Sequence, residues 1–258
     1  MRFLSRDFSY YRDLILVLTA KEIKVKYKNS ILGYVWSILN PLSMAVVFYF
    51  AFKFVMKISV ENFALFLVLG LFPWQWFSNS VSSSSTVFLG NSSLIKKVNF
   101  PRYFIPLATV FNDAFHYIVS LPVIFGFVLF YNITPTFSWA YGIPLLVLSQ
   151  FFITYGCALA TSSINLFFRD LEKLVMIALN IFFYLTPIIY DISLVPEEFK
   201  DYFLLNPFFG IIEGWHNLFL KGYIDWPLYF ISLFQSLTIF AVGFLIFKKL
   251  SWKFAEVL

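Results

Sequence analysis

Residues 26–36, KYKNSILGYVW, join a basic segment directly to a long apolar run that begins near residue 34 and contains Asn40-Pro41. A run of about 20 apolar residues is the length that a helix needs to cross roughly 30 Å of hydrocarbon. Lysine and arginine collect on the cytoplasmic side of membrane proteins. The stretch therefore predicts that the chain enters a membrane at this point, from the cytoplasmic side.

The composition of the 258-residue chain favours the same class. It is 60% hydrophobic and only 13% charged, with a mean hydropathy of +0.79, far outside the averages of soluble domains. We predict an all-α polytopic membrane protein without a removable signal peptide. Residues 1–33 would form an N-terminal cytoplasmic amphipathic arm, and residues 34–258 would form a single transmembrane domain. The predicted spans of this domain lie at about 34–56, 63–86, 105–130, 141–168, 173–190 and 228–247.

Basic residues predict the orientation of these spans. The arm, the loop near 87–104, the turn at 169–173 and the tail together hold 15 lysines and arginines, whereas the opposite side holds four. Both termini are therefore expected in the cytoplasm. The net charge of +5 then reflects topology and contact with anionic lipids, and not a nucleic-acid partner, because the basic residues are scattered along membrane edges.

The N-terminal arm carries two stripes at helical spacing. The first is apolar and consists of Phe8, Tyr11, Ile15 and Leu18; the second is basic and consists of Lys21, Lys24 and Lys28. A helix of this kind can lie in the headgroup layer with its lysines towards lipid phosphates. The alternative is a cytoplasmic helix that packs on a partner.

Residues 191–227, between the last two predicted spans, combine six of the fourteen acidic residues with apolar, proline-punctuated segments. The piece 208–220 is too short to cross a membrane. Two short re-entrant helices on the external side would fit, because irregular backbone is tolerated at that depth where protein or a cavity satisfies it. They could form an external gate or only a packing element or cap. The candidate gate residues are Pro196, Phe199, Phe203, Pro207, Phe208, Glu213 and Trp215.

Polar residues within the spans supply the remaining candidates. The hydroxyl-rich run 78–86 can form a close-packed helix seam or line a hydrated cavity, and Ser82 and Ser85 are possible pathway residues. Asp113 and His116, which are further possible pathway residues, share one helical face. We interpret them as a local polar pair, with a proton relay as the alternative. Two histidines and one cysteine make a metal site improbable, and no phosphate-binding glycine loop or catalytic motif is present in the sequence.

The loop 89–106 contains a short potential helix. Asn91 or Ser92 could cap its start, and Phe100-Pro101 would end it. Such a helix, exposed to the cytoplasm, suits docking to another protein, although a plain basic connector is equally compatible with the residues alone.

Five motifs, in order along the chain, resemble those of one family. They are KYKxSxLGxxW at 26–36 with Pro41, LIKKVxFPR at 94–102, FRDL at 168–171, TPIIY at 186–190 and LNPF at 205–208. The arrangement resembles the membrane subunit of type-2 ABC exporters, specifically the polysaccharide branch that exports O-antigen, capsule or teichoic acid, and it is most similar to O-antigen permeases. Lys21-Glu22-Ile23 and Tyr103 depart from the usual pattern, which could alter charge pairing with a partner.

The resemblance implies a function and a set of sites. Two copies of the chain would pair with two ABC ATPase subunits, and the ATPase subunits would bind the ATP and Mg. The complex would move a lipid-linked polysaccharide across the bacterial inner membrane. This chain would hold no cofactor and would not be an enzyme. The coupling helix would involve Asn91, Leu94, Ile95, Lys96, Lys97, Val98, Phe100 and Arg102, and the interface helix Lys21, Lys24, Lys28, Gly33 and Trp36. The competing classes are a polyprenol-linked transferase, which needs a reactive cluster around Asp113 and His116, and an ion-coupled transporter, which usually has internal repeats.

Overall fold

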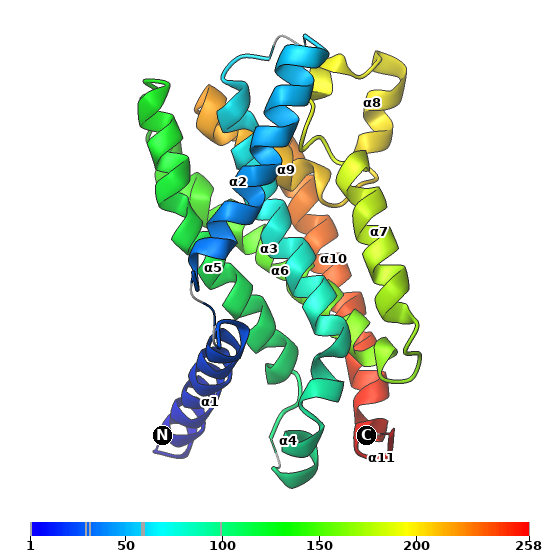
Figure 1. The fold of residues 1–258 in the computed structure, drawn as a ribbon. Helices are drawn as coiled ribbons and strands as arrows, with labels where there is room; N and C mark the ends of the chain where they lie inside the picture. The colour runs from blue at the N-terminus through cyan, green and yellow to red at the C-terminus, as the bar shows by residue number, and fades with distance from the viewer. Residues whose placement is uncertain (1, 29, 31, 58–59, 99, 258) are drawn as a thin grey trace.

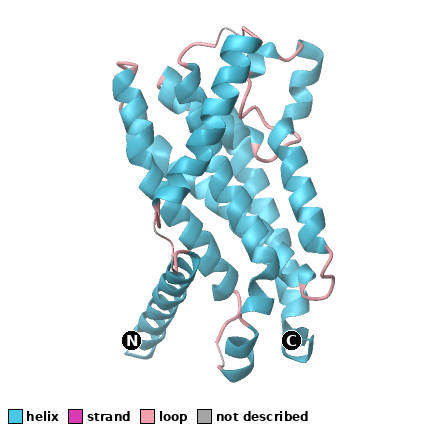
Figure 2. Ribbon diagram, in the orientation of Figure 1, coloured by secondary structure: helices cyan, strands magenta, loops and turns pink. Residues whose placement is uncertain are grey.

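The computed structural model describes residues 2–28, 30, 32–57, 60–98 and 100–257, and these residues form helices and loops without a strand (Figures 1 and 2). The predicted all-α class is therefore confirmed. The α-helices are α1 (Arg2–Lys26), α2 (Val35–Tyr49), α3 (Phe63–Gly90), α4 (Ser92–Lys97), α5 (Phe104–Phe130), α6 (Ser138–Asn165), α7 (Leu171–Leu185), α8 (Glu197–Phe203), α9 (Phe209–His216), α10 (Trp226–Leu250) and α11 (Phe254–Val257). Shorter π or 3₁₀ segments cover Phe50–Val55, Ile192–Leu194, Asn217–Lys221 and Ser251–Lys253.

Four helical stretches in the described part of the chain are long and apolar enough to cross a membrane: Val35–Val55, Phe104–Phe130, Ser138–Asn165 and Trp226–Lys253. Helices α3 and α7 run alongside them in the bundle (Figure 1). Helix α3 has 28 residues but includes the hydroxyl-rich run, and α7 has only 15 residues. The sequence therefore predicted the position of all six helices, while four of them satisfy the length and hydropathy that a span requires.

The fifth predicted span, about 173–190, was expected to be short and to end at Thr186-Pro187, and α7 does end there, so only residues 186–190 of that range are not helical. Helix α7 ends at Leu185, and Thr186 is extended with φ −105° and ψ 137°. Pro187 explains the early end, because the residue before a proline is displaced from the helical region by a steric clash. Residues 186–190 continue as a turn that packs Ile188 and Ile189 into the bundle.

Helix α3 lies at the centre of the bundle and contacts α2, α5, α6, α7 and α9. The most extensive helix pair is α6 with α10. Gly156 and Gly243 permit it: a Cβ added at Gly156 would lie 2.6 Å from the Cα of Phe240. Small residues allow this close approach of helix backbones in membrane proteins.

The buried apolar side chains form two separate clusters. The larger one includes Phe66, Trp76 and Trp215, whereas the second joins Leu18 of α1 to Phe88 of α3 and Phe254 of α11. The second cluster lies at the end of the bundle that carries both chain termini and α4 (Figure 1). We call this end the terminal end.

Candidate functional site

Helix α4 is attached to α1 at the terminal end. Asn91 occupies the N-cap position, and its backbone oxygen accepts from the amides of Leu94 and Ile95 at 3.1 Å each. Its side chain does not cap the helix as expected, since Nδ2 donates to the Val87 oxygen at 2.9 Å and Oδ1 accepts from Nζ of Lys21. Asn91 thus joins α1, α3 and α4.

The predicted coupling residues fall into two groups. Ile95 and Phe100 are buried in the second apolar cluster, where they anchor α4 to the bundle. Arg102 donates from Nη1 to the Ser251 oxygen at 2.6 Å and fixes the start of α5 to the C-terminal segment. Leu94 is partly buried, whereas Lys96, Lys97 and Val98 are exposed. Only the exposed group forms a surface that another protein can contact.

Helix α1 packs its apolar stripe on the chain itself. Leu18 is 6% exposed, and the ring of Tyr11 stacks on Phe104 of α5 with centroids 5.6 Å apart. Leu18 is therefore covered by protein and not by lipid, while Lys21, Lys24 and Lys28 are exposed as predicted. The side chain of Phe8 lies outside those that the structure describes.

The connection from α1 to α2 turns at Gly33. Its φ of +47° lies in the left-handed region, which glycine adopts without the steric cost of a Cβ. Trp36 follows in the first turn of α2 and is 54% exposed. Pro41 lies inside α2, where its missing N–H leaves the Ser37 carbonyl without the usual helical donor.

A polar network ties the end of α1 to α5. Nζ of Lys26 lies 2.7 Å from Oδ1 of Asp113, whose other oxygen accepts from Ser80 at 3.1 Å. Asn112 donates to Asp113 Oδ1 at 3.1 Å, so the carboxylate, which is 2% exposed, has three partners. A buried charge with a counter-ion and hydrogen-bond donors is stable, whereas an isolated one is not.

His116 has a separate partner. Its Nε2 lies 3.2 Å from the hydroxyl of Tyr27, and burial raises the pKa of Tyr27, so that this hydroxyl keeps its proton. Asp113 and His116, which we interpreted as one local pair, therefore contact Lys26 at the end of α1 and Tyr27 directly after it, respectively. They make no hydrogen bond to each other in the described structure. The end of α1 and the turn after it thus supply partners to both side chains, in addition to the bonds that Asp113 receives from Ser80 and Asn112.

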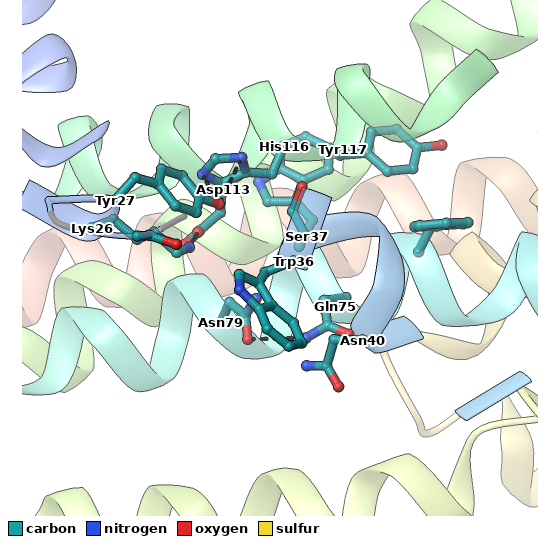
Figure 3. A pocket seen from close by; sticks show the side chains of 13 residues that line it. Lys26, Tyr27, Trp36, Ser37, Asn40, Gln75, Asn79, Asp113, His116 and Tyr117 are labelled. Carbon is teal, nitrogen blue, oxygen red and sulfur yellow. Dashed lines mark hydrogen bonds and ion pairs between the residues drawn. The ribbon is translucent and has the colours of Figure 1, made fainter. Parts of the chain in front are cut away.

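A cavity of about 310 Å³ lies beside this network (Figure 3). It is lined by side chains from the end of α1, the α1–α2 connection, α2, α3 and α5: Lys26, Tyr27, Ser30, Trp36, Ser37, Asn40, Phe72, Gln75, Trp76, Asn79, Asp113, His116 and Tyr117. We call it the amide cavity, because Asn40, Gln75 and Asn79 lie together on one side of it with the indole of Trp36 (Figure 3).

The amide cavity adjoins a groove of about 490 Å³ between α2, α3 and α7, and the two share Asn40, Gln75 and Asn79 as wall residues. The groove is further lined by Met44, Leu71, Trp74, Ser78, Ser82, Met176, Leu179, Asn180, Phe183 and Tyr184. Ser82 was a predicted pathway residue and does line this space. Ser85 does not: it is 2% exposed, and its hydroxyl donates to the Ser82 oxygen at 2.6 Å.

The predicted gate residues divide between surface and interior. Pro196 precedes α8, on which Phe199 is half exposed and Phe203 partly buried. Partly buried Pro207 leads into α9. Phe208, Glu213 and Trp215 are instead inside the bundle, because α9 packs between α3, α6 and α10. These three do not share a surface with α8, so the seven residues do not form one site.

Hydrogen bonds fix α9 in this interior position. Trp215 donates from Nε1 to Oε1 of Gln150 at 3.2 Å, and Gln150 donates to the Pro73 oxygen at 2.8 Å. Nε2 of His216 lies 3.1 Å from the backbone oxygen of Phe66 in α3. The helix is therefore held by polar contacts to α3 and α6 as well as by apolar packing.

Several cavity residues were not among the predicted site residues, including Lys26, Tyr27, Asn40 and Gln75. Asn79 was not named as a site residue either, but it belongs to the run 78–86, for which a cavity lining was one of the two interpretations. A signal for two of these residues was present. Gln75 and Asn79 are four residues apart and precede Ser82 by seven and three, so all three fall on one face of α3. Asn40 and Lys26 carry no comparable signal, because their place in the cavity depends on how α1 and α2 fold back onto α3 and α5.

Comparison with known proteins agrees with the fold and with the motifs. Residues 13–220 match the family model described as ABC-2 type transporter. The chain is 42% identical over 252 residues to an O-antigen export system permease protein RfbA of Klebsiella pneumoniae, covering 98% of this chain and 97% of that protein.

Two further relatives extend the comparison. An RfbA protein of Myxococcus xanthus is 31% identical over 220 residues, which is 84% of each chain. The polysialic acid transport protein KpsM of Escherichia coli is 22% identical over 253 residues, covering 93% of this chain and 95% of that one. The chain belongs to the ABC-2 type transporter family, as one of its membrane permeases.

Proposed function

We propose that the chain is the transmembrane subunit of an ATP-driven exporter that moves a lipid-linked polysaccharide of the O-antigen type from cytoplasm to periplasm. The observation that carries this proposal is the 42% identity over almost the full length of an O-antigen export permease. Capsule export is the second candidate, and the 22% identity to a polysialic acid transport protein supports it more weakly.

The proposed topology has six crossings of the bacterial inner membrane, made by Val35–Val55, α3, α5, α6, α7 with residues 186–190, and α10. Both termini lie at the terminal end (Figure 1), as an even number of crossings requires. The excess of lysine and arginine in the arm, the α4 loop, the 169–173 turn and the tail supports a cytoplasmic terminal end. Residues 1–33 then form a cytoplasmic arm, and α8 and α9 belong to the external side, where α9 re-enters the bundle.

The proposed partner is an ABC ATPase subunit, in two copies, that binds the ATP and Mg. Lys96, Lys97 and Val98 would contact it, because they are exposed at the end of α4 and directly after it. A displacement of α4 would be passed to α1 through Asn91 and Lys21 and to the bundle through Ile95. Rigid-body movement of this kind is a common way to couple a distant site to a pathway.

The proposed pathway is the groove between α2, α3 and α7, completed by a second copy of the chain. Apolar side chains on α2 and α7 flank this groove and are exposed, among them Val46, Val47, Ile177 and Ile181. Part of this surface would face lipid and part the second copy. The mixed polar and aromatic lining suits a glycan, whose rings present both hydroxyls and apolar C–H faces.

A complementation experiment tests the proposal. The chain is produced in a strain that lacks its own O-antigen permease but retains the matching ATPase, and surface O-polysaccharide is measured. We expect export, and co-purification of the tagged chain with the ATPase in mild detergent. Replacement of 94–98 by alanine should abolish both, whereas alanine at Lys248 and Lys249 in the tail should leave both intact. Export without ATP hydrolysis, or a permease that never binds the ATPase, would refute the proposal.

A further inference from the structure

We infer that the amide cavity binds an uncharged saccharide unit of the exported chain. This inference rests on the proposed function and goes beyond it, because it assigns a defined site and a ligand class to one part of the proposed pathway. Four observations carry it: free hydrogen-bonding groups, an exposed indole, balanced charge and continuity with the groove.

The cavity contains side-chain groups that have no hydrogen-bond partner in the described structure. They are the whole amide of Asn40, the Nδ2 of Asn79, the Oε1 of Gln75 and the Nε1 of Trp36; the Nε2 of Gln75 reaches Asn79 Oδ1 at 3.4 Å. Unpaired polar groups at membrane depth face a water-filled cavity or a ligand, because exposure to hydrocarbon is costly. A carboxamide offers a donor and an acceptor together. Neighbouring hydroxyls of a sugar ring offer the complementary pair.

Trp36 adds an apolar face to these amides. Its indole is 54% exposed and lies next to Asn79, Gln75 and Asn40 (Figure 3). The π-face of an aromatic ring favours contact with C–H groups that carry partial positive charge. A sugar ring has such groups on one side and hydroxyls at its rim, so stacking on the indole would direct the hydroxyls towards the amides.

The charges of the cavity exclude the lipid diphosphate as the preferred ligand. Lys26 and Asp113 are the charged residues among those lining it, and they pair with each other at 2.7 Å. Diphosphate recognition uses unpaired arginine or lysine donors, which give short charge-assisted hydrogen bonds. The Asp113 carboxylate would also repel an anion. The cavity is therefore suited to a neutral sugar.

The size and position of the cavity agree with this assignment. About 310 Å³ is near the lower end of the range for small-molecule sites. It can hold a short saccharide unit and not a folded glycan. Because Asn40, Gln75 and Asn79 also line the groove, a chain that leaves the cavity would enter the groove without losing contact with these amides.

A binding experiment tests the inference on the permease–ATPase complex in lipid nanodiscs. The probe is the oligosaccharide released by mild acid from the host's own O-polysaccharide, and inorganic pyrophosphate is the competitor; binding is measured by saturation-transfer NMR. We expect binding that pyrophosphate does not displace. Trp36→Ala and Asn79→Leu should each weaken oligosaccharide binding by about tenfold or more, and Trp36→Phe should weaken it less. The control is Trp252→Ala, which removes an exposed indole in the tail and should leave oligosaccharide binding unchanged.

The outcomes separate this inference from the proposed function. Three results would overturn the saccharide site: the wild type does not bind the oligosaccharide, both cavity variants bind it as tightly as the wild type, or pyrophosphate displaces it. Complementation by the wild type would still support the exporter in each case. Melting temperatures and elution volumes of the variants are compared with those of Trp252→Ala. If one cavity variant is misfolded, the other, together with Trp36→Phe, decides the result.

Discussion

The ion pair between Lys26 and Asp113 makes a directional prediction, because its two partners differ in exposure. The Asp113 side chain is 2% exposed and the Lys26 side chain 36%. Removing the lysine leaves a buried carboxylate without a counter-ion, which costs about 3–5 kcal/mol in typical buried pairs. We expect a cost near 3 kcal/mol for Lys26→Met, because the lysine is partly hydrated and Ser80 and Asn112 still donate to the carboxylate.

Removing the acid should cost less. In Asp113→Asn the lysine can turn towards water, and an amide oxygen can still accept from Ser80, so that about 1 kcal/mol is expected. The double variant should resemble Asp113→Asn, which corresponds to a coupling energy of about 3 kcal/mol between the two positions. For a chain of this length, 3 kcal/mol corresponds to a melting temperature lower by about 6–12 °C.

The assay is thermal unfolding in nanodiscs, combined with hydrogen exchange of the α1 amides. Lys26→Met should melt lowest and exchange fastest in α1, since that helix loses its polar attachment to α5. Lys24→Met, an exposed lysine two residues earlier, is the matched control and should behave as the wild type. An equal loss from Lys26→Met and Asp113→Asn, or none from either, would refute the argument from unequal burial.

Three other changes are predicted. Gly156→Ala should lower the melting temperature through overpacking of about 1–3 kcal/mol at the α6–α10 contact, whereas Gly126→Ala, which meets open space, should not destabilise. Gly33→Leu should reduce export by disturbing the turn at φ +47°, measured by surface O-polysaccharide, and normal export would contradict that role. Arg102→Gln should speed proteolysis of the C-terminal segment by weakening the bond to the Ser251 oxygen; an unchanged rate would contradict this.

Much of the fold could be predicted from the sequence because membrane helices are encoded locally. Apolar length and flanking charge predicted the six helices to within a few residues, apart from α7. There the helix ends before Thr186-Pro187, although apolar residues continue to Tyr190. Hydropathy records the tendency of a segment to leave water, whereas a proline acts on backbone geometry, and the two signals conflict at this point.

The sites were less predictable because they depend on contacts between distant segments. Lys26 and Asp113 are 87 residues apart, and the sequence indicates that each is polar without indicating that they meet. The same dependence on contacts between distant segments explains why the predicted gate residues are divided between the surface and the interior. The segment that holds Glu213 and Trp215 was expected to act as a gate or to serve as a packing element or cap, and its residues alone did not indicate that it packs between α3, α6 and α10.

The hydroxyl-rich part of α3 shows which information the sequence did contain. Helical periodicity puts Gln75, Asn79 and Ser82 on one face and Ser80 and Ser84 on another. The first face lines the amide cavity and the groove, whereas the second is fully buried, with Ser80 bonded to Asp113. The cavity and packing interpretations of this run were therefore both correct, each for its own face. Composition alone could not separate them, because serine suits a close helix contact as well as a wet surface. The larger amides are less ambiguous: a side chain with two donors and two acceptor lone pairs fits a tight seam only where partners meet it, as they meet Gln150. Amides without such partners identify the face that meets water or substrate.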